Sequence, residues 1–163
     1  MRVFLAAFVG VLCSGLLSDW LMRRGASQGF ARKLPIIAGL LGASTIMAAN
    51  WVEGDVAVIA ILSGAFFAQG MTGLGWTLIS DIAPKAVLGL TAGIFNFSTN
   101  LAGIITPIVI GVLFARTGSF VGPLAYIAVV ALIGAFSYSV VLGDIHRLEL
   151  DDVQPARVPA ERR

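Results

Sequence analysis

The chain has few of the residues that support chemistry. Its 163 residues include one cysteine and one histidine, and only 12% are Asp, Glu, Lys or Arg. The lone Cys13 excludes an intrachain disulfide and a cysteine-rich metal site. The sequence also lacks a nucleophile–base pair, a metal-ligand cluster and a phosphate-binding loop, so we expect no enzyme, no catalytic residue, no cofactor and no metal. The net charge of +2 is spread over loops and tail, and predicts no nucleic-acid partner.

Long apolar runs dominate instead. The chain is 58% hydrophobic with a mean hydropathy of +0.93, against about 45–50% hydrophobic residues in soluble domains. A run of about 20 apolar residues crosses the hydrocarbon layer, and lipid forces the backbone to pair within a helix. The sequence therefore predicts an all-α membrane protein with a five-helix domain at 1–143 and a disordered cytoplasmic tail at 144–163. The expected spans are 3–21, 35–51, 56–79, 88–114 and 121–142.

The loop charges predict an orientation. Five spans put the two ends of the chain on opposite sides, and one of the two assignments places nine basic residues in the cytoplasm and two outside. Because cytoplasmic loops carry an excess of Lys and Arg, we expect the N-terminus outside and the C-terminus inside. An outside start at Met1 is unusual for a whole protein, so we expect earlier spans in a longer one. The nine cytoplasmic residues are Arg23, Arg24, Arg32, Lys33, Lys85, Arg147, Arg157, Arg162 and Arg163, and the two outside are Arg2 and Arg116.

A glycine–acid–base motif follows the first span. Gly15 is followed four residues later by Asp19 and then by the pair Arg23 and Arg24. Glycine permits close helix approach, and a carboxylate at a helix end can accept hydrogen bonds from a neighbouring helix N-terminus. The pattern resembles the loop signature of the major facilitator superfamily. The alternative is that the charged residues merely mark the end of a membrane helix.

Six further segments extend this resemblance. In order they read ARKLPII at 31–37, GLGW at 73–76, SDIAPK at 80–85, GIFN at 93–96, TPIVIG at 106–111 and TGSF at 117–120. Together they resemble the anion:cation symporter branch of that superfamily, and within it the carriers of glucarate, galactarate or galactonate. The resemblance implies helices eight to twelve of a twelve-helix fold in a bacterial inner membrane. It also implies that a proton and a sugar-acid anion are partners of the full carrier, whose N-terminal half and seventh helix lie outside this chain.

The fourth span carries a polar stripe. Small and polar residues recur at three- and four-residue steps and share one helix face, which we expect to meet protein or water. A second, bulky stripe is expected to meet lipid. Asn96 and Asn100 are costly against hydrocarbon and should point inward; the resemblance places the binding asparagine at Asn96, whereas Asn100 can equally join helices. The two stripes are Gly89, Gly93, Asn96, Asn100, Gly103, Pro107 and Gly111, and Ile94, Phe97, Leu101, Ile105, Ile108 and Val112.

The third span repeats this pattern with Gln69, Thr72 and Trp76 on one face. Gln69 can bridge hydroxyl groups, and Trp76 offers an indole donor and an apolar ring to a carbon chain. Packing or anchoring at the membrane interface is the alternative for these residues. Asp81 is expected to cap the fourth span, with Asp19 docked beside it as a conformational latch.

Deep charges are missing from all five expected spans. A proton-coupled carrier of an anion needs a titratable group on its path, and the resemblance implies that this group belongs to the N-terminal half. Tyr126 and Tyr138 are interpreted as packing or interface residues, and His146 lies in the tail. We therefore expect the C-terminal part of a secondary transporter for a sugar-acid anion. The alternative is a noncatalytic membrane fragment or small membrane assembly protein.

Overall fold

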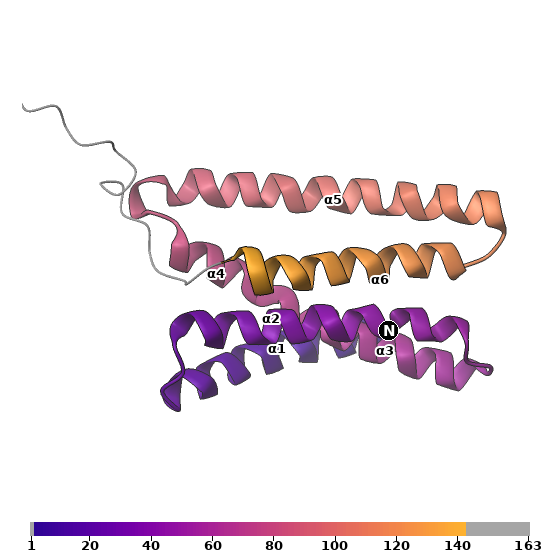
Figure 1. Ribbon diagram of the computed structural model, residues 1–163, viewed down its shortest axis with the longest axis horizontal. Helices are drawn as coiled ribbons and strands as arrows, with labels where there is room; N and C mark the ends of the chain where they lie inside the picture. Colours follow the sequence, from indigo (N-terminus) through magenta and orange to yellow (C-terminus); the bar gives the residue numbers. More distant parts are fainter. Residues whose placement is uncertain (1, 143–163) are drawn as a thin grey trace, which may run out of the picture.

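The computed structural model describes residues 2–142, so the expected tail at 144–163 lies outside the described residues. Helices account for nearly all of the described chain (Figure 1). Five stretches are long and apolar enough to span a membrane, which confirms the predicted number of spans and the all-helical class. The main helices are α1 (Arg2–Arg23), α2 (Gln28–Ser44), α3 (Asp55–Met71), α4 (Gly75–Ile82), α5 (Leu88–Thr117) and α6 (Val121–Phe136).

The second span begins earlier than the hydropathy pattern predicts. Ser27 caps α2, its hydroxyl accepting a hydrogen bond from the backbone N–H of Phe30 at 3.3 Å. Pro35 is therefore inside the helix rather than in its first turn. The first two turns escaped the prediction because their basic residues lower the local hydropathy, although a capping serine precedes them.

A short 3₁₀ turn interrupts the third span. The turn, Thr72–Leu74, separates α3 from α4, and together they form one membrane-length stretch from Asp55 to Ile82. Three glycines, Gly70, Gly73 and Gly75, fall in or beside this break. Glycine weakens a helix interior by about 1 kcal/mol relative to alanine, so this is where the regular helix gives way most easily. The first, third and fourth spans also run slightly past their expected limits, whereas the fifth ends at Val141, one residue before its expected end.

Helix α3 is held between α1 and α2 by close backbone contacts. A Cβ added at Gly10 of α1 would overlap the carbonyl oxygen of Phe67, and one added at Gly70 of α3 would overlap the carbonyl oxygen of Ala7. Gly39 on α2 faces α3 in the same way, at the carbonyl oxygen of Ala68. Small residues therefore let three helices approach with almost no side chain between them. The result is a tight three-helix unit (Figure 1).

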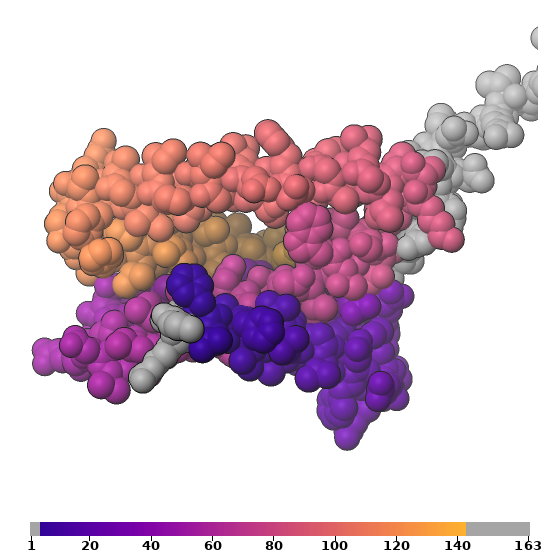
Figure 2. All heavy atoms as spheres, turned by 180° about the vertical axis from the view of Figure 1, so that it is seen from behind, coloured from indigo at the N-terminus to yellow at the C-terminus, as the bar shows by residue number. Residues whose placement is uncertain are grey.

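Helices α5 and α6 form the other side of the molecule. Helix α6 packs on α2, and its last turn widens into a π-helical turn at Ser137–Val141. Helix α5 packs against α6 and α4 and has no buried residue. Figure 2 shows it running along one edge of the molecule. The small buried core, Ile36, Leu74 and Leu78, lies instead where α2 meets α4 and the turn before it.

Candidate functional site

Arg32 joins three helices at one end of the bundle. Its Nε donates a hydrogen bond to Asp81 Oδ2 at the end of α4 at 3.1 Å, and its second guanidinium nitrogen donates to the Ser18 hydroxyl of α1 at 3.3 Å. Ser18 is fully buried, and the Arg32 and Asp81 side chains are 16% and 20% exposed. A single guanidinium thus bridges α2, α4 and α1, because its planar fork can donate in several directions at once.

Lys33 extends this junction to the last span. Its ammonium group donates to the backbone carbonyl of Leu142, just after the π-helical turn. The last carbonyls of a helix carry partial negative charge, so a cation there is stabilising. Arg32 and Lys33, which were expected only as loop charges, therefore connect α2 to α1, α4 and the end of the fifth span.

Asp81 does not cap the fourth span. Val87 occupies the N-cap position of α5, and no side chain makes a capping hydrogen bond there. The expectation of a cap was wrong because Arg32, 49 residues earlier in the chain, captures the Asp81 carboxylate.

The glycine–acid–base motif lies in the last turns of α1, before the connection to α2. Asp19, Arg23 and Arg24 are exposed, and nothing approaches the position of a Cβ on Gly15. A surface hollow here is lined by α1 residues, among them Asp19 and Arg23. Helix α1 packs on α3 and α2, and the described part of the chain gives Asp19 no hydrogen bond or ion pair with the start of α5. The docking of Asp19 stays a prediction for the full carrier.

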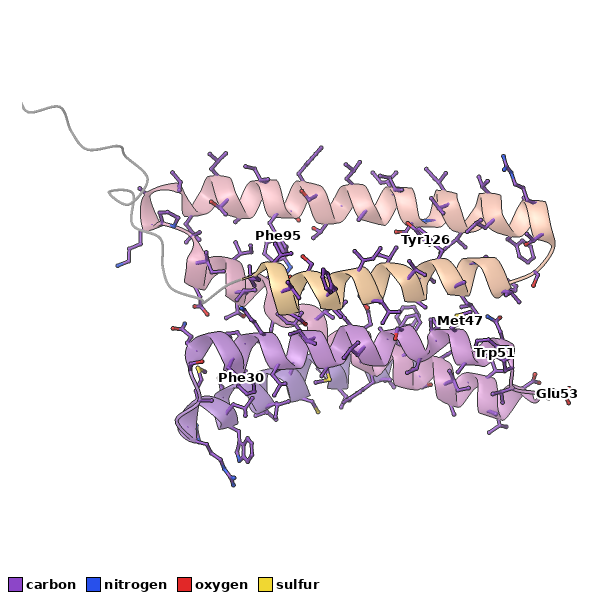
Figure 3. All side chains as sticks on the ribbon, viewed as in Figure 1. Phe30, Met47, Trp51, Glu53, Phe95 and Tyr126 are labelled. Atoms are coloured by element: carbon purple, nitrogen blue, oxygen red, sulfur yellow. The ribbon has the colours of Figure 1, made fainter. Side chains whose placement is uncertain are left out.

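Trp76 and Phe95 bring α4 and α5 together. Their rings meet edge to face, with centroids 4.9 Å apart and planes at 87°. Trp76 remains 48% exposed, so its contact with Phe95 leaves much of the indole open. Figure 3 shows Phe95 in the space between α5 and the helices below it. Phe95 was not singled out as a site residue, although it precedes Asn96 in the GIFN segment.

Asn96 and Asn100 form a hydrogen-bonded ladder on α5. The Asn100 amide nitrogen donates to the Asn96 side-chain oxygen at 2.9 Å and to its backbone carbonyl at 2.8 Å. Both residues are exposed. The Asn96 side-chain oxygen accepts this hydrogen bond, and its two amide hydrogens meet no acceptor among the described residues. The pair therefore presents donors rather than joining α5 to another helix.

Three faces, rather than two, run along α5. The face that packs on α4 and α6 lies between the two predicted stripes, and the three faces are about 120° apart at 100° per residue. The small-polar stripe, which was expected to meet protein or water, is exposed along its whole length and contacts no other helix among the described residues. The bulky stripe is also exposed, as a lipid-facing surface would be. The packing face comprises Leu88, Thr91, Ala92, Phe95, Thr106, Val109, Ile110 and Leu113.

Gln69 lies apart from this cluster. It lines a cavity of about 430 Å³ bounded by α2, α3, α5 and α6, where Tyr126 and Tyr138 add hydroxyl groups to mostly apolar walls. Figure 3 shows Tyr126 in the space between α5 and α6. Thr72, one turn beyond Gln69, is half-buried, and its hydroxyl donates to the Gln69 backbone carbonyl at 2.7 Å. The tyrosines were expected to be packing or interface residues, and no sequence spacing relates them to Gln69.

The charged groups of the described residues gather near the ends of the helices. Figure 3 places Glu53 at the end opposite Phe30, which lies near the Arg32 junction. No cluster of three metal-ligating side chains occurs among residues 2–142. Trp76 and Phe95 meet on the packing face of α5, whereas Asn96 and Asn100 lie on its small-polar stripe, about a third of a turn around the helix. None of the four side chains is charged, so they can contact a polar solute but supply no charge to it.

Comparison with known proteins identifies relatives over most of the chain. No family model matches it. The chain is 48% identical over 145 residues to a D-galactonate transporter of Escherichia coli. This match covers 89% of the chain and 34% of the transporter. It is 45% identical over 146 residues to the probable galactarate/D-glucarate transporter GudP of Escherichia coli, covering 90% of this chain and 32% of that protein. The Bacillus subtilis GudP is 41% identical, again over 90% of this chain and 32% of the relative.

These relatives are named transporters and not enzymes, which supports the expected lack of enzymatic activity. The chain spans about a third of their length. Over about nine-tenths of its own length, the chain is similar to proteins named as transporters of galactonate, galactarate or glucarate, and it corresponds to about one third of such a protein.

Proposed function

We propose that this chain is the C-terminal wall of a carrier that takes up a sugar-acid anion of the galactonate, galactarate or glucarate type together with a proton. In this proposal the described helices are the eighth to twelfth of twelve. The carrier lies in a bacterial inner membrane, and the remaining spans supply the opposite wall of the path. The observation that carries the proposal is the 41–48% identity to named sugar-acid transporters along nine-tenths of the chain.

The neutral aromatic and amide groups of α4 and α5 support the choice of solute. A sugar acid presents hydroxyl groups and a carboxylate on an apolar carbon backbone. The Asn96 amide hydrogens can donate to those oxygens, and the open part of the Trp76 indole can cover the carbon chain. Asn100 fixes the orientation of the Asn96 amide through its own hydrogen bond. The bound solute would then contact a side chain whose position is set in advance.

The charge required for an anion must come from elsewhere in the carrier. Among residues 2–142, the acidic and basic groups other than Arg2 lie in or beside the first and last turns of the helices, not beside Asn96. A buried cation to bind the carboxylate and a titratable group to carry the proton therefore belong to the other wall. In transporters with two rocking halves, the solute binds between them near the middle of the membrane.

The basic residues support an inward-facing C-terminus. Five of the described cations, Arg23, Arg24, Arg32, Lys33 and Lys85, lie at the end of the bundle where the fifth span finishes. The excess of positive charge at that end favours the cytoplasm. The alternative of a small membrane assembly protein would use the same packing without transport.

Uptake measurements in a completed carrier test the proposal. The chain is joined or co-expressed with the remaining two thirds of a GudP-type relative, and uptake of labelled galactonate and glucarate is followed with and without a protonophore. Uptake should appear, fall with the protonophore, and drop at least tenfold in Asn96→Ala. Ser98→Ala, a polar residue off the small-polar stripe of the same helix, should retain it.

Two results would contradict parts of this proposal. A stable complex that takes up no sugar acid would favour the assembly-protein alternative. Normal uptake by both Asn96→Ala and Trp76→Ala would show that neither residue binds the solute. Uptake that is insensitive to the protonophore would remove the proton from the mechanism and leave the substrate class intact.

A further inference from the structure

We propose that the end of α1 binds the headgroup of an anionic phospholipid, through Arg23 and Arg24 beside the ring of Trp20. The site would take a phosphodiester such as that of phosphatidylglycerol, in the leaflet next to the Arg32 junction. This proposal requires that the chain lie in a membrane and is independent of transport.

The cations at this end of the bundle fall into two groups. Arg32 and Lys33 are half-buried and bound to other helices, through Asp81, Ser18 and the carbonyl of Leu142. Arg23 and Arg24 are exposed, and the described residues offer neither of them an ion pair. The first group therefore holds the protein together, whereas the second directs its donors outward. An arginine matches a phosphate in geometry because its fork can donate two parallel hydrogen bonds.

Trp20 holds one of these arginines in place. The Arg24 guanidinium carbon lies 4.1 Å from the centre of the Trp20 ring, a cation–π contact. The indole is 48% exposed, and a surface hollow beside it is lined by Leu16, Leu17, Asp19, Trp20 and Arg23. Tryptophan prefers the depth of the lipid headgroups, and two basic residues follow within the next turn of helix. The ring thus fixes a cation at the depth where phosphates lie.

An apolar strip continues from this hollow along α1. Leu16 is 71% exposed, and Leu12 and Val9 continue the same side of the helix at about one turn per step. An acyl chain attached to a headgroup at Arg23 would lie along this strip. A small soluble anion could use the arginines but would leave the strip uncovered, which favours a lipid as the occupant.

Asp19 sets the charge balance of the site. Its carboxylate lies in the same hollow, so the site carries one negative and two positive charges. The net charge of one positive matches a headgroup that carries one negative charge. A zwitterionic phosphatidylcholine headgroup gains no net attraction from that balance.

Native mass spectrometry of the purified 163-residue chain in detergent tests this site. Phosphatidylglycerol and phosphatidylcholine with identical acyl chains are titrated separately, and the lipid-bound fraction is measured. Phosphatidylglycerol should bind at least about fivefold more tightly, since one basic residue near an anionic surface contributes roughly that factor. The double variant Arg23→Gln/Arg24→Gln should lose this preference, and Arg23→Lys/Arg24→Lys should keep most of it.

A matched control separates the site from general surface charge. Lys85→Gln removes one exposed cation at the same end of the bundle but away from the Trp20 ring, and should leave the preference unchanged. Equal binding of the two lipids by the wild-type chain would overturn the proposal, as would an undiminished preference in the double glutamine variant. Competition by soluble glycerol phosphate at the same concentration as the lipid would also overturn it, because the site would then accept small anions without an acyl chain.

Discussion

At the scale of single residues, the junction at Arg32 is the clearest determinant of this arrangement. One guanidinium contacts a carboxylate on α4 and a fully buried hydroxyl on α1. Because the pair is largely shielded from water, loss of one partner leaves the other charge poorly compensated. The neutral ladder of Asn96 and Asn100 has the opposite character, since its donors remain open.

Removing the Arg32–Asp81 pair should destabilise the bundle. Arg32→Gln or Asp81→Asn alone should lower the free energy of unfolding by about 1–3 kcal/mol, because each leaves a shielded charge or its donors unpaired. The double variant should cost less than the sum of the two, which denaturant titrations in micelles would show as a coupling. Strict additivity of the two changes would mean that the pair contributes nothing. Lys85→Gln serves as the surface control.

Sequence reasoning placed Arg32 and Asp81 at one end of the bundle, since each flanks an apolar run, but it predicted no contact between them and did not single out Ser18. Whether Arg32 meets Asp81 depends on which helix ends meet in space, since the two residues are 49 positions apart in the sequence. Hydropathy carries no such information, so the expected cap on α5 was wrong.

At the scale of helices, close crossing without side chains distinguishes α1, α2 and α3. The glycine contacts at Gly10 and Gly70 place backbone directly on backbone. Within lipid, where burial of apolar surface gives little driving force between helices, such van der Waals contact is a main source of association. The individual glycines on these helices therefore differ in how much they contribute to helix association.

Alanine substitutions should distinguish glycines at close backbone crossings from glycines with open space around them. Gly70→Ala and Gly10→Ala should each cost about 1–3 kcal/mol, because the new Cβ overlaps a backbone carbonyl that cannot turn aside. Gly64→Ala on α3 and Gly15→Ala on α1 have nothing within 4 Å of the added atom, and should be neutral or slightly stabilising. Thermal unfolding in one detergent compares all four. Equal losses of stability at all four sites would show that the close helix crossings do not determine the effect of these substitutions.

The two exposed faces of α5 should have different surroundings, with water at the small-polar stripe and lipid at the bulky stripe. In the completed carrier on a Cys13→Ser background, a water-soluble maleimide should label Asn100→Cys and should not label Leu101→Cys, its neighbour on the bulky face. Added sugar acid should slow the first reaction. Equal labelling of both positions would mean that the small-polar stripe does not face water. The sequence predicted these two stripes but not the packing face between them, because Phe95, Thr106 and Leu113 belong to neither pattern.

At the scale of the whole molecule, five spans with an uneven charge distribution predict one orientation in the membrane. The fold class and the number of spans followed from hydropathy, because lipid leaves the backbone little choice. The order in which the helices pack did not follow from hydropathy, because hydropathy does not distinguish the apolar residues of one span from those of another. Only the positions of glycines and charged residues distinguish the spans.

Side-specific labelling of intact cells would establish the orientation. On the Cys13→Ser background, a membrane-impermeant maleimide should label Ser119→Cys, in the turn between α5 and α6, and should reach Lys85→Cys only after the cells are opened. The physical reason is the excess of positive charge at the Lys85 end. The reverse pattern would place the C-terminus outside.

The packing of α1 and α2 around α3 in the three-helix unit also has a consequence for synthesis. Segments fold from the N-terminus as the ribosome delivers them, and α3 completes its glycine contacts with partners that are already inserted. All three helices of this unit precede α5 in the chain, so the unit can form first and act as a template against which the two later spans pack.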